Sequence, residues 1–189
     1  MAQEDKQRWD EKHAQDTMPH APIKFITQYA HLAKGKQALD IACGNGRHSK
    51  YLTSIGFKVD ALDISSVAIE QLKDERNIEA KEVDFDSYVL EKNKYNLIVC
   101  TYFLERKLFP QMLEALKPDG IILMETFVAH EDNGRKASHP TFRLKVGELE
   151  AYFSKSCELI HMQEWWDIDY QGFKSLKATM VARKVARKL

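Results

Sequence analysis

The sequence predicts an α/β fold, a doubly wound sandwich in which helices cover both faces of an open, mainly parallel sheet. Short apolar runs alternate with amphipathic segments from Gln37 onward, and several runs end in glycine or aspartate. Two late apolar runs, near Cys157–Trp166 and Phe173–Arg183, flank a turn at Asp167–Gly172. Strands that alternate with helices pair in parallel, because each helix returns the chain to the same end of the sheet. The closing hairpin adds an antiparallel edge.

Length and composition predict one domain that spans residues 1–189. The chain has 189 residues, and a domain has roughly 150. Its 28 Lys and Arg balance 28 Asp and Glu, whereas domains that bind nucleic acid usually carry a basic excess. We therefore expect no nucleic-acid partner.

We expect neither a membrane-spanning segment nor a signal peptide. No apolar run reaches the roughly 20 residues that span a bilayer, and residues 1–16 lack the apolar core of a signal peptide. Three cysteines do not make a disulfide framework. We expect a soluble, cytoplasmic protein without a membrane partner, and the sequence does not predict its oligomeric state.

The first half of the chain predicts elements in a regular order. Residues 1–16 are polar and, apart from Trp9, show no apolar helical stripe, so this segment is either a tail or a lid. Apolar spacing and turn residues then predict the following elements: a helix over 23–33, a strand at Ala38–Ala42, a helix that ends at Gly56, a strand at Phe57–Leu62, a helix capped by Ser65 or Ser66, and a strand near Ala80–Asp84.

The second half continues the alternation up to the hairpin. Ile121–Met124 is a continuous apolar run, which is typical of a central parallel strand. Pro110 suits the first turn of a helix. The remaining patterns predict the following elements: a strand at Tyr95–Cys100, a helix that carries Phe109 to Leu116, and a helix that buries Val146, Leu149 and Phe153.

The first strand runs into the glycine-rich loop Cys43–Gly46. Glycine lets the backbone turn tightly and approach a ligand closely. No Gly-Lys-Ser/Thr follows, so this is not a phosphate loop of the Walker type. The third glycine of a dinucleotide fingerprint is replaced by Ser49. The loop therefore predicts a ligand near the backbone but favours neither a triphosphate nor a dinucleotide.

Three carboxylates are expected at successive strand tips: Asp40, Asp63 and Asp84. Each alone could be a solvated strand end. Together they suit a pyrophosphate poorly, because like charges repel, and open α/β sheets bind ligands at this edge. They suit a ligand that offers an amino group, ribose hydroxyls and an adenine amine. S-adenosylmethionine has all three and no phosphate.

With these residues the chain resembles the class I S-adenosylmethionine-dependent methyltransferases, and among them the bacterial tellurite-resistance-type enzymes that act on small molecules. The resemblance extends from about Trp9 to Arg183 and implies a Rossmann-like methyltransferase sandwich with a seven-stranded, mostly parallel sheet. Its main blocks are 39–52, 59–65, 83–85, 103–109, 116–120, 125–127 and 142–149.

The resemblance implies roles for the residues of the first loop. Gly44 and Gly46, with the backbone of Cys43 and Asn45, should pack against the methionyl part and the ribose of the cofactor. Asp40 should accept a hydrogen bond from the amino group, directly or through water.

Residues after the next strands should hold the other end of the cofactor. The resemblance implies that Asp63 takes the ribose hydroxyls and that Ile64 lies along the adenine. Asp84 should accept from the adenine amine, with Phe85 over the ring. Thr101 should face the cofactor near the sulfonium.

Two positions depart from the family pattern. Ala42 replaces the usual first glycine of the loop, and Asn96 replaces an aspartate that is common at the start of the fourth strand. We expect neither change to impair binding.

The methyl acceptor should bind above the fourth and fifth strands. Arg106 and Tyr102 are the predicted catalytic residues, with Arg106 orienting an anion, since guanidinium offers oxyanions a planar fork; a salt bridge to Glu105 or Glu125 is the alternative. A soft anion such as a thiolate, selenite or tellurite needs no base. The residues expected around this mouth are Tyr102, Arg106, Glu125, Phe127, His130 and Phe142.

Other activities fit less well. The position after the fourth strand reads Cys100–Phe103, without the Asn/Asp-Pro-Pro-aromatic run of amino-directed base methyltransferases. The seven His and Cys43 show no metal-ligand spacing, so no metal is expected. A non-catalytic module that binds S-adenosylmethionine and, less well supported, an NAD-dependent oxidoreductase remain the alternatives.

Overall fold

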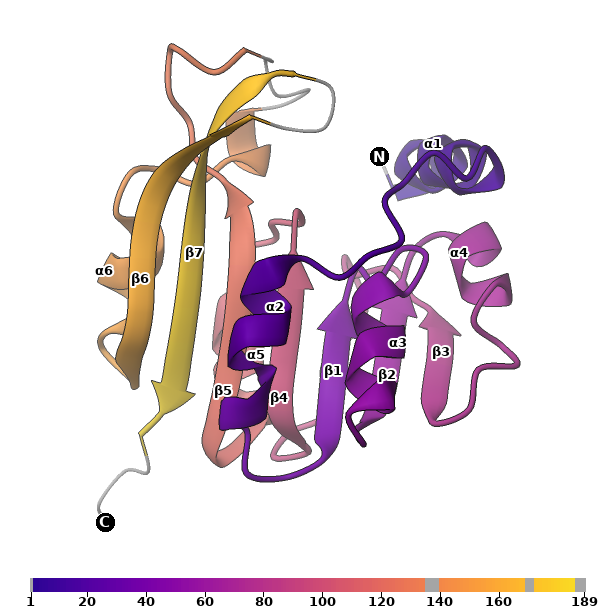
Figure 1. Cartoon of the computed structure of the whole chain (residues 1–189), viewed down its shortest axis with the longest axis horizontal. Helices are drawn as coiled ribbons and strands as arrows, with labels where there is room; N and C mark the ends of the chain where they lie inside the picture. Colours follow the sequence, from indigo (N-terminus) through magenta and orange to yellow (C-terminus); the bar gives the residue numbers. More distant parts are fainter. Residues whose placement is uncertain (1, 135–139, 169–171, 186–189) are drawn as a thin grey trace.

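A seven-stranded sheet with strand order β3-β2-β1-β4-β5-β7-β6 forms the centre of the computed structural model (Figure 1). The structure describes residues 2–134, 140–168 and 172–185. The first five strands are parallel, whereas β7 runs antiparallel to both β5 and β6. The strands are β1 Gln37–Ile41, β2 Lys58–Asp63, β3 Ile78–Glu82, β4 Tyr95–Thr101, β5 Leu116–Phe127, β6 Cys157–Ile168 and β7 Lys174–Lys184.

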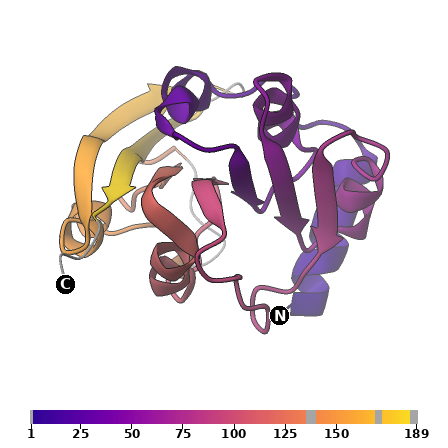
Figure 2. The ribbon, with the colours of Figure 1, turned by 90° about the horizontal axis from the view of Figure 1, so that it is seen from below.

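Helices cover both faces of this sheet (Figure 2). Residues of α2 and α3 pack on one face in one apolar cluster, and residues of α5 and α6 pack on the other face in a second cluster. The helices are α1 Ala2–Ala14, α2 Lys24–Tyr29, α3 Arg47–Ser54, α4 Ser66–Glu70, α5 Leu108–Ala115 and α6 Glu148–Phe153, with short 3-10 helices at Ala30–Leu32 and Pro140–Phe142. The predicted doubly wound sandwich is confirmed.

Most local signals agree with the structure. The Ser65 hydroxyl caps α4 by accepting from the Ala68 amide at 3.2 Å, and β2 ends at Asp63 as predicted. Two boundaries differ. The edge strand β3 ends at Glu82, so Asp84 lies in the turn that follows it. Val146 precedes α6 and is 66% exposed. Residues 169–171 of the predicted hairpin turn lie outside the described residues.

The N-terminal segment, for which the sequence left a tail or a lid open, is a helix, α1. In Figure 1 it lies beyond the carboxyl ends of the strands, beside α4. The Asp10 carboxylate accepts from the Ser65 hydroxyl at 2.6 Å and from the Val67 amide at 3.2 Å, and Lys6 pairs with Glu82 at 2.7 Å. An apolar stripe is not needed, because polar contacts with α4 and β3 hold this helix in place. No described helix is long and apolar enough to cross a membrane.

Candidate active site

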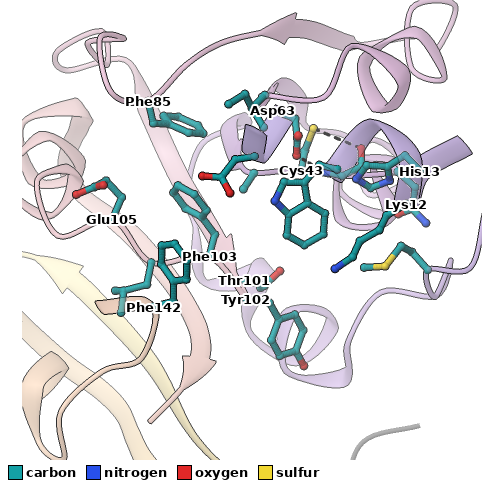
Figure 3. Close-up of a pocket in the computed structure, with 18 of the residues that line it drawn as sticks. Lys12, His13, Cys43, Asp63, Phe85, Thr101, Tyr102, Phe103, Glu105 and Phe142 are labelled. Atoms are coloured by element: carbon teal, nitrogen blue, oxygen red, sulfur yellow. Dashed lines mark hydrogen bonds between the residues drawn. The ribbon is translucent and has the colours of Figure 1, made fainter. Parts of the chain in front are cut away.

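A pocket of about 480 Å³ opens at the carboxyl ends of the parallel strands. Its wall comes from the loops after β1, β2, β3 and β4, from α1, and from residues near β5 and β7. The volume lies in the usual range for small-molecule sites. In Figure 3, Phe85, Phe103 and Phe142 lie on one side of the pocket, and Lys12 and His13 lie on the other.

The loop after β1 follows a left-handed path. Ala42 has φ +54°, Gly44 has φ +54° and Gly46 has φ +72°. This conformation costs a residue with a side chain about 1–3 kcal/mol. Alanine at position 42, where the family pattern has glycine, therefore strains the backbone. Ala42 and Gly44 both line the pocket.

Asp63 connects this loop to the end of β2. Its Oδ2 accepts from the Gly44 amide at 2.8 Å, and its Oδ1 accepts from the Ser65 amide at 2.9 Å. The side chain lines the pocket and is buried. Burial raises the pKa of Asp63, while the hydrogen bonds from the backbone amides and the nearby His13 oppose that rise.

The adenine-side residues of the prediction also lie on the wall. Ile64, Asp84 and Phe85 line the pocket. The Asp84 Oδ1 accepts from the Asp86 amide at 2.8 Å, which fixes the turn after β3. The rings of Phe85 and Phe103 pack 5.3 Å apart. Carboxylate and apolar surfaces thus meet at this end.

Two predicted cofactor residues are not on the wall. Asp40 is 1% exposed, and its Oδ2 accepts from the Ser49 hydroxyl at 2.6 Å. Gly46 faces the core instead, since a Cβ there would lie 2.4 Å from the Leu72 side chain. Neither Asp40 nor Gly46 is among the described residues that line the pocket. Asp40 and Gly46 thus lie behind the loop, and their predicted contacts with the cofactor, which for Asp40 include one through water, stay predictions; Cys43 and Asn45 line the pocket.

Asp40 should make stability depend on pH. Burial is the main cause that raises its pKa from 3.8 to about 7. The folded state then binds this proton more tightly than the unfolded state, so stability falls as pH rises from about 4 to 7, at about 1.4 kcal/mol per pKa unit. Urea unfolding of wild type and Asp40→Asn should diverge over that range, with the variant relatively more stable near pH 7. A difference that does not change with pH would contradict this.

Tyr102 lines the pocket directly after β4. Its backbone has φ +57°, and its hydroxyl donates to the Glu125 Oε1 at 2.6 Å. The Lys177 ammonium donates to the same hydroxyl at 3.2 Å and pairs with Asp167 at 2.5 Å. This network fixes the Tyr102 ring, which packs 5.4 Å from Phe127.

Arg106 is not among the described residues that line the pocket, because its guanidinium is bound by other parts of the chain. Its Nε and Nη2 donate to the two Glu148 carboxylate oxygens at 2.5 and 2.9 Å. Its other bonds go to the backbone oxygens of Thr141 and Arg143 at 2.7 and 2.9 Å. The guanidinium fork thus joins the loop after β4 to residues 141–148. The salt-bridge alternative was right in kind, but the partner is Glu148.

Of the other residues expected around the acceptor mouth, some line the pocket and some do not. Phe127 and Phe142 line the pocket, as does Thr101, whose hydroxyl lies 3.4 Å from the His48 Nδ1. Glu125 is buried behind Tyr102. His130 lies against Trp166 instead, with ring centres 5.0 Å apart.

Helix α1 contributes a wall that the sequence did not indicate as a helix. Five of its residues line the pocket: Asp5, Arg8, Trp9, Lys12 and His13. A Cβ built on Gly44 would lie 3.2 Å from the His13 Cε1, so helix and loop nearly touch. The ring of Trp9 stacks with that of His13 at 6.1 Å. Of this wall, the sequence pointed only to Trp9.

The donor set fits S-adenosylmethionine. The pocket combines the Asp63 and Asp84 carboxylates with apolar surface from Ile64 and Phe85. Carboxylates accept from hydroxyl and amino groups, and they favour a cationic sulfonium while they disfavour phosphate. The residues present therefore match an adenosine-bearing cation better than a pyrophosphate.

Known proteins agree with this assignment. The model of the family described as tellurite resistance protein TehB matches residues 3–171. The crystal structure of TehB from Haemophilus influenzae superposes with a TM-score of 0.75 at 25% identity, covering 93% of this chain and 67% of that one. A methyltransferase from Methanosarcina mazei, described as S-adenosylmethionine-dependent, shares the fold with a TM-score of 0.68 at 19% identity, covering 88% of this chain and 100% of that one.

A curated relative extends the comparison in sequence. The ubiquinone biosynthesis O-methyltransferase of Paraburkholderia phytofirmans is 31% identical over 115 residues, which cover 55% of this chain and 49% of that protein. The chain thus spans about half the length of the curated relatives it matches. Because the family model covers most of the sequence, this chain belongs to the TehB family of S-adenosylmethionine-dependent methyltransferases.

Proposed function

We propose that this protein transfers a methyl group from S-adenosylmethionine to a small-molecule acceptor whose nucleophile is soft or already anionic, such as a thiol, selenite or tellurite. The single observation that supports this most is the division of the pocket. Asp63 ends β2 and Asp84 follows β3, while Tyr102 follows β4 and Phe127 ends β5. One end suits the cofactor, and the other leaves room for an acceptor.

The pocket histidines support an acceptor that needs no base. Burial lowers the pKa of His48 to about 3, and burial also lowers the pKa of His13. With a pKa of about 3, His48 is a weak proton acceptor near neutral pH, and the lowered pKa of His13 also weakens it as a base. Glu125, the nearby buried acid, is already bound to the Tyr102 hydroxyl. A nucleophile that reacts without losing a proton does not need the base that these groups are too weak to provide.

The chemistry divides between cofactor and protein. S-adenosylmethionine supplies an activated methyl group. The protein's residues hold the two reactants in place: Asp63 and Asp84 would bind the cofactor, and Tyr102 and Phe127 would face the acceptor. Such positioning contributes on the order of 7–11 kcal/mol. Helix α1 forms one wall of the pocket and would limit the access of water, which strengthens polar contacts inside.

Two measurements test the proposed function. Calorimetry should show binding of S-adenosylmethionine and no binding of NAD, whose pyrophosphate would meet the carboxylates. Formation of S-adenosylhomocysteine should then be followed with a panel of thiols, selenite, tellurite and catechols. Turnover with a soft nucleophile supports the proposal. Tight cofactor binding with no turnover on any member would favour the non-catalytic binding module.

We also propose that α1 is a lid, and its deletion tests this. Removing residues 1–16 should lower turnover at least about tenfold, because five pocket-lining residues are lost, while the melting temperature changes by only a few degrees. Amides of residues 5–14 should gain protection from hydrogen exchange when S-adenosylmethionine binds. Glu11→Ala, on the exposed side of the helix, is the control and should retain full activity. Equal turnover of the truncated protein would refute the lid.

A further inference from the structure

One cation on the Tyr102 side of the pocket, Arg47, forms no ion pair with a described carboxylate, although its charge acts on the buried Asp40 and Glu125. Arg47 is the first residue of α3, lines the pocket and is partly buried. Its guanidinium carbon lies 5.6 Å from the centre of the Tyr102 ring. Within the described ranges, its guanidinium forms no ion pair and donates no hydrogen bond. A guanidinium has five N–H donors, and here none has a protein acceptor.

The neighbouring cations are already engaged. The Lys177 ammonium contacts the Asp167 carboxylate and the Tyr102 hydroxyl. Arg106 is held by Glu148, and Arg143 also has an interaction of its own. An anion that enters this end of the pocket would therefore meet donors that are not in use at Arg47.

Strand order places Arg47 toward the acceptor and not toward the adenosine. The predicted ribose and adenine carboxylates follow β2 and β3, on one side of β1. Tyr102, beneath the guanidinium, follows β4 on the other side of β1. The surface around it is aromatic, because Tyr102 packs against Phe127 and Phe142 also lines the pocket.

We infer that Arg47 binds an anionic group of the methyl acceptor, most simply a carboxylate, while the apolar body of the acceptor packs against Tyr102 and Phe127. The guanidinium fork matches a planar carboxylate with two parallel hydrogen bonds. This inference rests on the proposed function and narrows it: the acceptor is a small aromatic or apolar thiol that carries a carboxylate. A bare oxyanion would leave the aromatic wall unused.

Binding of a product-like pair tests the inference without turnover. The probes are 4-(methylthio)benzoate and its neutral analogue 4-(methylthio)benzamide, titrated by calorimetry into the full chain saturated with S-adenosylhomocysteine. Wild type should bind the benzoate at least about tenfold more tightly, as expected for charge-assisted hydrogen bonds. Arg47→Met should bind the two probes equally, and Arg47→Lys should keep part of the preference.

Two controls show whether an effect of Arg47→Met comes from the loss of its guanidinium at the pocket, from the loss of one positive charge anywhere, or from unfolding. Arg76→Met removes an exposed arginine outside the pocket wall and should keep the full preference for the benzoate. Melting temperature shows whether Arg47→Met is folded. Equal binding of the two probes by wild type, or an unchanged preference in Arg47→Met, overturns the inference. A tenfold loss of S-adenosylhomocysteine affinity in Arg47→Met, with the preference intact, would assign Arg47 to the carboxylate of the cofactor and overturn it too.

A turnover experiment distinguishes this inference from the proposed function. 4-Mercaptobenzoate and 4-mercaptobenzamide should both be methylated, and Arg47→Met should raise KM at least about tenfold for the acid alone. If the benzoate preference depends on Arg47 but neither thiol is methylated, the thiol reaction is wrong and the anion site stands. If both thiols react alike in wild type and variant, the anion site is wrong and methyl transfer stands.

Discussion

Asp63→Ala should weaken S-adenosylmethionine binding at least about tenfold and lower the free energy of unfolding by about 1–3 kcal/mol. Two effects add. The predicted acceptor of the ribose hydroxyls is lost, and the amides of Gly44 and Ser65 lose the carboxylate that they now share. Because those amides belong to two different loops, their relative position should loosen as well. Calorimetry and urea unfolding measure the two effects separately.

A conservative change isolates the charge at this position. Asp63→Asn retains one oxygen acceptor and nearly the same volume, so we expect a smaller loss of stability than in Asp63→Ala. The loss of cofactor affinity should remain, because a charged acceptor binds hydroxyls more strongly than a neutral one. Unchanged affinity in folded Asp63→Ala would remove this residue from the binding site.

Gly44→Val should abolish cofactor binding. Gly44 has φ +54°, and a Cβ there would lie 3.2 Å from the His13 ring of α1. A β-branched side chain would be strained in this left-handed conformation, by about 1–3 kcal/mol. It would also fill space between the loop and α1 that belongs to the pocket wall. Binding of S-adenosylmethionine, followed by calorimetry, is the readout.

The chain offers a matched control for backbone strain. Gly56 has φ +92°, but no atom lies within 4 Å of a Cβ built there. Gly56→Val should therefore lose comparable stability and keep full cofactor affinity. A second comparison separates α1 from the cofactor: adding His13→Ala to Gly44→Ala should restore stability if the clash with the helix dominates. Normal binding by Gly44→Val would refute the role of the glycine loop.

Local patterns were enough to predict most of the fold. Runs such as Ile121–Met124 are apolar throughout because both faces of a central parallel strand are covered, and that property is visible in one sequence. The serine that caps α4 and the glycine loop after β1 also act within a few residues. The carboxylate at the end of β2 could be placed at the pocket for the same reason, since strand ends share one edge of the sheet.

Helix α1 was missed because its stability is not local. Its partners, Ser65 and Glu82, lie 55 and 76 residues from Asp10 and Lys6 in the chain, and Trp9 is the one apolar residue among the five of this helix that line the pocket. Periodicity detects apolar burial and not such polar contacts. The helical form of this segment and its place in the wall around Gly44 therefore became visible only in the folded molecule.

The sheet, the loop after β1 and the family could be predicted because they depend on residue types at short spacing. Which side chains line the pocket, and which are bound by other residues, depends on contacts between distant parts of the chain. Arg106 looked available but is bound by Glu148, 42 residues away. Asp40 turns beneath the loop to Ser49. Arg47 lies over the Tyr102 ring and forms no ion pair among the described residues. Side chains of one type are equivalent in a sequence, and only the partners that folding brings within hydrogen-bonding distance determine which of them remain available to bind a ligand.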